Sequence, residues 1–206
     1  MLIAASVFFV FLVYSVVEML IPLPFGNKSI EFEIKRGSTF RQVVNDLAER
    51  GLVRDRWVVH ALGRVTGTDR KIKAGYYPLW GTMNPWQIFN AIRQGKIIEY
   101  EITVVPGDSL REIEQKFVAQ TAIDSEEFQK LCTSRELLDS LDVDAPSLEG
   151  YLFPDTYRFP KGLEVKEVLS MMVDRLREKF DDEFTLRTLE MGISEREVLT
   201  IASIVE

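Results

Sequence analysis

The sequence predicts an α+β protein with an N-terminal transmembrane helix, a small α+β domain and the first part of a larger α+β domain. Three observations predict this class. They are an apolar run at residues 1–21, a strand–turn–helix pattern that occurs twice, and an irregular aromatic segment followed by a C-terminal amphipathic stretch. We expect the parts to be a transmembrane helix, a linker, a first domain and an incomplete second domain, at residues 1–21, 22–29, 30–99 and 100–206.

Composition narrows the chemistry that this chain can perform. Its 206 residues hold 25 basic and 32 acidic side chains, which gives a net charge of −7 and argues against a nucleic-acid partner. A single His and a single Cys exclude an internal disulfide, the usual catalytic zinc sites and His-based triads. We therefore expect neither a metal nor a cofactor, and carboxylates are the candidate catalytic groups.

Residues 1–21 are apolar except for Ser6, Ser15 and Glu18. A helix of this length would span roughly 30 Å, the thickness of the hydrocarbon core of a bilayer. Pro22 and Pro24 end the segment. The alternative is a buried core helix, but such helices rarely lack a polar face. The first part of the chain is thus predicted to be a single membrane-spanning helix.

A strand–turn–helix pattern starts at Phe32 and recurs without gaps at Ile102. In each copy, alternating apolar residues predict a strand with one buried face, and a glycine supplies the turn. A Ser or Thr followed three residues later by Gln or Glu then predicts a capping box at the start of a helix, at Thr39 and at Ser109. Each helix carries an apolar stripe that we expect to be buried.

Two further elements complete the predicted first domain. Residues 75–79 read as a short strand, and Asn84 precedes a helix with Pro85 at its first position that ends at Gly95. The glycine-Ser/Thr turn resembles that of LysM-like modules, which bind N-acetylglucosamine-containing glycans, although it also fits a generic turn. Three tryptophans could stack on sugar rings or contribute to a core: Trp57, Trp80 and Trp86.

The segment at residues 148–159, LEGYLFPDTYRF, combines carboxylates and aromatic rings in a stretch too irregular for a helix. Rings that stack on a sugar, beside carboxylates that accept its hydroxyls, are typical of carbohydrate sites. A loop or hairpin anchored by aromatic packing is an equal alternative. The candidate substrate-binding residues are Glu149, Tyr151, Asp155 and Tyr157.

The last residues predict a helix that begins with a capping box at Ser194 and Glu197. We expect its buried face to consist of the apolar residues Val198, Ile201, Ala202 and Val205. Glu206 lies at the edge of that face, one turn beyond small residues that leave room for a ligand. An apolar setting would raise the pKa of its carboxyl group, as a general acid requires. A solvated Glu at a helix end is the alternative.

LEGYLFPDTYRF, followed by LTIASIVE at residues 199–206, resembles the endolytic murein transglycosylase family, the YceG-like proteins. The resemblance extends over essentially the whole chain. It implies that Glu206 is the catalytic acid and base, and that the substrate is the peptidoglycan glycan strand. It also implies a single-pass anchor in the cell (inner) membrane, with the main domain on the periplasmic or extracytoplasmic side, and peptidoglycan synthases as partners.

The mechanism that this resemblance implies needs one carboxylate. Glu206 would protonate the glycosidic oxygen and then accept the proton of the muramic acid 6-hydroxyl as that oxygen attacks C1, which forms a 1,6-anhydro sugar. Family members continue beyond the ASIVE motif, so we expect this chain to be inactive alone. The alternatives are a non-catalytic membrane-anchored peptidoglycan-binding module and a scaffold for cell-wall synthesis.

Overall fold

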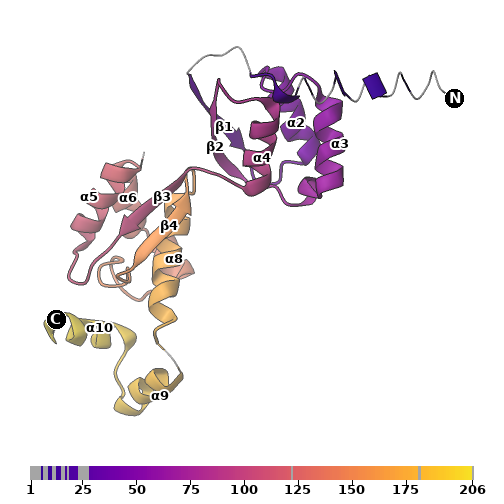
Figure 1. The fold of residues 1–206 in the computed structure, drawn as a ribbon. Helices are drawn as coiled ribbons and strands as arrows, with labels where there is room; N and C mark the ends of the chain where they lie inside the picture. Colours follow the sequence, from indigo (N-terminus) through magenta and orange to yellow (C-terminus); the bar gives the residue numbers. More distant parts are fainter. Residues whose placement is uncertain are drawn as a thin grey trace. The chain divides into compact units, whose positions relative to one another are not determined.

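The computed structural model divides the chain into two compact units, Met1–Ile98 and Glu99–Glu206, which Figure 1 draws in indigo to magenta and in pink to yellow. The expected domains were residues 30–99 and 100–206. The residues that the structure describes are 6, 9–10, 13–14, 17, 19–22, 28–121, 123–180 and 182–205.

The first unit contains a two-stranded antiparallel sheet with helices packed against it (Figure 1). Its elements are β1 (Ser29–Ile34), α2 (Phe40–Glu49), α3 (Arg56–Thr66), the short 3-10 helix η1 (Thr68–Arg70), β2 (Gly75–Trp80) and α4 (Pro85–Gln94). The register places Phe32 opposite Tyr77. Both side chains are buried, so this pair forms the centre of the core between the sheet and the helices.

The start of the chain reaches this core. Met19 is buried against it, and the Asn84 side-chain amide donates a hydrogen bond to the Leu20 carbonyl at 3.3 Å. Many of residues 1–21, where a transmembrane helix is predicted, lie outside the described residues. Among the residues that the structure does describe, there is no helix with the length and apolar character needed to cross a membrane.

The second unit is also built on a two-stranded antiparallel sheet, formed by β3 and β4. Its elements are β3 (Glu99–Thr103), α5 (Leu110–Gln120), α6 (Ser125–Cys132), α7 (Arg135–Ser140), β4 (Thr156–Pro160), α8 (Val165–Arg177), α9 (Asp182–Met191) and α10 (Glu195–Val205). The strands are distant in sequence, and Ile102 pairs with Tyr157. A core of buried side chains from α5, α6, α8 and both strands surrounds this pair.

The predicted repeat is confirmed in its backbone geometry. Gly37 and Gly107 have φ angles of 80° and 82°. In both turns, the residue after the glycine donates its backbone N–H to the carbonyl two residues before the glycine, at 3.1 Å. A positive φ at the third position of such a turn favours glycine. Both capping boxes form, at Thr39 and Ser109, so the same local signals build the entry to each unit.

The predicted buried face of the C-terminal helix is wrong. α10 begins after the expected Ser194 capping box, but it contains no buried residue. Ile201 is 53% exposed and Val205 is 81% exposed, whereas Leu199 packs partly against the second core. The apolar pattern identified the helix correctly. The same pattern does not show which part of the molecule packs on the apolar face of the helix. In the described part of the chain, nothing covers this face of α10.

Candidate active site

The segment between α7 and β4 holds three of the five candidate site residues, Glu149, Tyr151 and Asp155, and a fourth, Tyr157, lies on β4 itself. The segment has no regular structure before β4, and the Tyr151 N–H donates to the Leu148 carbonyl at 3.0 Å to close a turn. Gly150, inside this turn, has a φ angle of 81°. A residue with a Cβ is strained at that angle, so the glycine fixes the directions in which the neighbouring Glu149 and Tyr151 side chains leave the turn.

Both candidate tyrosines lie in the core. Tyr151 is 4% exposed and Tyr157 is 6% exposed. The Tyr157 hydroxyl donates a hydrogen bond to the Phe153 carbonyl at 2.5 Å. Burial raises the pKa of Tyr157 to about 12, and it raises the pKa of Tyr151 with a further contribution from Glu195. These two rings therefore anchor the segment against the core.

Glu149 points to a different place, the N-terminus of α5. Its two carboxylate oxygens lie 3.1 and 3.2 Å from the Leu110 backbone nitrogen, whose N–H they accept. The first N–H groups of a helix lack a partner within the helix, and the helix dipole favours a negative charge there. Glu149 thus supplies a cap from a distant part of the chain, and it remains exposed to solvent.

Glu149 shares an open hollow of about 560 Å³ with Glu114. Glu114 is 9% exposed, and its carboxylate accepts hydrogen bonds from the Ser125 hydroxyl and from the Gln129 amide nitrogen, which lies 3.1 and 2.9 Å from its two oxygens. These bonds lower the pKa of Glu114. Two carboxylates and polar helix side chains therefore border one concave surface between α5 and α6. Such a surface can accept sugar hydroxyls or amides.

Asp155 faces α8. Its carboxylate accepts a hydrogen bond from the Thr156 N–H at 2.8 Å and pairs with the Arg175 guanidinium, also at 2.8 Å. These bonds hold the pKa of Asp155 below its ordinary value, the Thr156 N–H having the larger effect. Arg175 also pairs with Glu178 at 2.7 Å. Asp155 is thus fixed in its ionised form at the start of β4.

The structure separates the predicted binding residues into three environments rather than gathering them. Glu149 borders the α5–α6 hollow, Asp155 pairs with Arg175 of α8, and the two tyrosines are in the core. Glu206, the candidate catalytic residue, lies outside the described residues.

Sequence reasoning missed Glu114. The signal was present, because Glu114 lies four residues after Leu110 and three before Phe117 and therefore falls on the predicted buried stripe of α5. A carboxylate on such a stripe needs hydrogen-bond partners. In the described part of the chain, no cluster of three or more His, Cys, Asp or Glu residues could hold a metal ion.

A two-stranded sheet in each unit, with helices packed on it, defines a mixed α+β protein, and its LEGYLFPDTY segment is anchored in the second core. A model of the YceG-like family matches residues 32–206. The chain therefore belongs to the YceG-like family.

Two curated relatives, both called endolytic murein transglycosylase, come from Streptococcus pneumoniae strains D39 and R6. Each is 24% identical to this chain over an alignment of 220 positions. The alignment covers 93% of the chain and 39% of the relative. The chain thus spans about two fifths of their length. A crystal structure of a YceG-like protein from Listeria monocytogenes aligns with 86% of this chain and 64% of its own, at 22% identity and a TM-score of 0.48.

Proposed function

We propose that this protein is a membrane-anchored peptidoglycan lytic transglycosylase that cuts glycan strands internally. The observation that carries this proposal is the family match over residues 32–206, together with relatives named for endolytic murein transglycosylation. Residues 1–21 would anchor the protein in the cell membrane as a single span, and the rest would act outside the cytoplasm. Peptidoglycan synthases are the proposed partners, because they supply the nascent strands that such an enzyme cuts.

Glu206 is the proposed acid and base. Its carboxylic acid protonates the glycosidic oxygen between N-acetylmuramic acid and N-acetylglucosamine, and the bond from C1 to that oxygen breaks. The carboxylate then takes the proton of the muramic acid 6-hydroxyl while O6 bonds to C1. The products are a 1,6-anhydro-muramic acid end and a free N-acetylglucosamine 4-hydroxyl, and the proton balance of Glu206 is restored.

Support for this role comes from the helix that precedes Glu206. α10 runs to Val205, directly before it, and places the small residues Ala202 and Ser203 one turn earlier. On a helix that continued through residue 206, these small side chains would leave space for a sugar next to the Glu206 carboxyl group.

Among the four residues of the LEGYLFPDTY segment, we assign polar substrate contacts to Glu149 and Asp155. Both retain solvent access, and both have carboxylate oxygens that sugar hydroxyls can approach. Tyr151 and Tyr157 take part by holding the segment in place, because their rings are buried.

The test is product analysis with the native gene product on isolated sacculi. We expect 1,6-anhydro-muropeptides, released from within strands, and their loss in the Glu206→Gln variant, which keeps the size of the side chain. Glu197→Gln is the matched control on the same helix, where the carboxylate only caps Ser194. Activity that survives Glu206→Gln would refute the catalytic assignment. Tight sacculus binding without any anhydro product would favour the non-catalytic binding module.

A further inference from the structure

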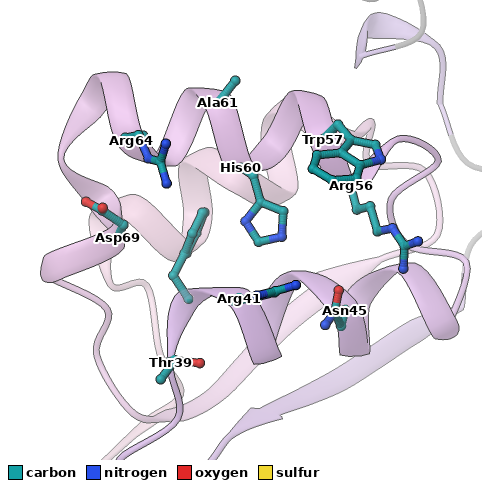
Figure 2. Close-up of a pocket in the computed structure, with 10 residues that line it drawn as sticks. Thr39, Arg41, Asn45, Arg56, Trp57, His60, Ala61, Arg64 and Asp69 are labelled. Atoms are coloured by element: carbon teal, nitrogen blue, oxygen red, sulfur yellow. The ribbon is translucent and has the colours of Figure 1, made fainter.

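A hollow of about 700 Å³ opens between α2 and α3 in the first unit (Figure 2), whereas the candidate active-site residues belong to the second unit. Phe40, Trp57 and Ala61 give it apolar surface. Its charged side chains are mostly basic, with Arg41 on α2 and Arg56 and Arg64 on α3.

The charge of this hollow opposes that of the protein, whose net charge is −7. Asp69 is the one acidic residue among the ten that line it, against three arginines. Within the described ranges, none of these guanidinium groups forms an ion pair with a carboxylate. Unpaired arginines around a concave surface create a positive potential that attracts anions and can bind carboxylates through two hydrogen bonds.

His60 lies between these arginines, and its pKa responds to their positive charge. Burial lowers the pKa of His60, and the charges of Arg41, Arg56 and Arg64 lower it further. Figure 2 shows His60 pointing from α3 toward α2, between Trp57 and Arg56 at one end and Arg64 and Asp69 at the other. The imidazole is therefore neutral at pH 7 and offers a hydrogen-bond donor and an acceptor instead of a fourth charge.

Trp57 adds a ring face to the same hollow. It is 73% exposed, although it is a large apolar side chain, and its backbone N–H is fixed by the Asp55 carboxylate at 2.8 Å. An exposed indole next to guanidinium groups is typical of sites that bind a ligand with both a flat apolar part and a charge.

We propose that this hollow binds the carboxylate-bearing stem peptides of peptidoglycan, with their free carboxylates on Arg41, Arg56 and Arg64 and an apolar face on Trp57. The identity of the polymer rests on the proposed function. The preference for an anionic part of that polymer rests on the arginines of the hollow itself. N-acetylglucosamine is neutral, so the sugars alone would not need these charges. A phospholipid surface fits less well, since the basic side chains face one another across a concave space rather than projecting from one convex face.

Isothermal titration of the 206-residue chain, held in a neutral detergent, tests this. Three ligands are compared: a disaccharide tetrapeptide with free carboxylates, the same compound with its carboxylates amidated, and a neutral N-acetylglucosamine tetramer. We expect the first to bind at least about 10-fold more tightly than the other two, and more weakly as salt is raised.

The variant R41Q/R56Q/R64Q should lose about 10-fold or more in affinity for the carboxylated ligand. The control R70Q/R93Q/K96Q removes the same charge from exposed positions of the same unit that do not line the hollow, and it should bind normally. Trp57→Ala should weaken binding, whereas Trp80→Ala on β2 should not. If the triple variant fails to fold, Arg64→Gln and Trp57→Ala alone provide the comparison.

Equal binding of the amidated ligand, or equal loss in both triple variants, overturns the proposal. So does binding to anionic phospholipid vesicles that needs these arginines while the muropeptide does not bind. Failure here is distinct from failure of the proposed function: a protein that forms anhydro-muropeptides but binds no carboxylated muropeptide in this hollow is still the proposed enzyme.

Discussion

Glu149 and Leu110 are 39 residues apart in the sequence, and the Glu149 carboxylate accepts the Leu110 backbone N–H at 3.1 and 3.2 Å. Ser109 already caps the N–H of Glu112 at the same helix end. Glu149 therefore satisfies a donor that the local capping box leaves free. This one contact joins the candidate binding segment to α5, so a residue proposed to touch substrate also stabilises the fold.

Glu149→Ala should consequently lower the free energy of unfolding by about 1 kcal/mol, as for the loss of a helix cap. Glu149→Gln should cost less, because it keeps an acceptor oxygen and loses only the charge at the helix terminus. Urea unfolding followed by circular dichroism measures both. An unchanged midpoint for Glu149→Ala would show that the contact does not stabilise α5.

The two groups that bind the Asp155 carboxylate, the Thr156 N–H and the Arg175 guanidinium, predict a dependence of stability on pH. The pKa of Asp155 is lower in the folded chain, so its contribution is complete above the ordinary value of about 3.9 and is lost as the pH falls further, through the lowered value. Asp155→Asn should reduce the urea midpoint at pH 7, and this difference should shrink below about pH 4.

Asp174→Asn is the control for this pH effect. Asp174 is an exposed carboxylate on α8 whose side chain has no described hydrogen bond or ion pair. Its substitution should shift the midpoint little at pH 7. A difference for Asp155→Asn that stays constant from pH 7 to pH 2 would contradict the explanation from the bonds to Thr156 and Arg175.

Cys132, the one cysteine of the chain, should be unreactive in the folded protein. Its side chain is fully buried, and burial raises its pKa to about 12, assisted by the charges of Glu114 and Glu149. We expect labelling by a disulfide reagent at pH 8 to be at least about 100-fold slower than in 6 M guanidinium. Comparable rates in both conditions would show that the second core opens readily.

Gly63 and Phe40 should show strong energetic coupling. A Cβ at Gly63 would lie 2.1 Å from the Phe40 ring, which is held by edge contacts with His60 and Phe89 at centroid distances of 5.8 and 6.5 Å. Gly63→Ala should therefore destabilise the first unit by about 1–3 kcal/mol.

Combining Gly63→Ala with Phe40→Leu should cost less than the sum of the two single substitutions, because the smaller side chain removes the clash. Gly37→Ala is the comparison, since it introduces only backbone strain at a φ of 80° with open space around the Cβ. Additive free energies for the Gly63 and Phe40 variants would exclude the predicted contact.

Local signals predicted the parts of the fold that local physics determines. The turns at Gly37 and Gly107, the capping boxes and the buried stripe of α2 all depend on residues within one or two helical turns. α3 was not predicted, because Gly63 and several β-branched residues lower its helix propensity and its stability comes from packing. α10 is the opposite case, because the sequence predicted the helix but not that its apolar face would be exposed.

The candidate site was less predictable, since it depends on long-range contacts. Tyr157 and Phe159 alternate with Arg158, which is the pattern of a half-buried strand, and they are indeed buried on β4. Nothing in the local sequence pairs Glu149 with α5 or Asp155 with α8. The arginines of the α2–α3 hollow were missed because Arg41 lies on α2 and Arg64 lies on α3. Local sequence patterns do not show that these two helices pack side by side.

Gly63 determines the spacing of these charges. Since its missing methyl group lets α3 pack directly on the Phe40 ring, it fixes how far Arg41 on one helix lies from Arg56 and Arg64 on the other. A ligand that places one carboxylate on each helix has to match this distance. Gly63 therefore influences which ligand length fits, although it does not contact the ligand. Any larger side chain at Gly63 would alter ligand preference as well as stability.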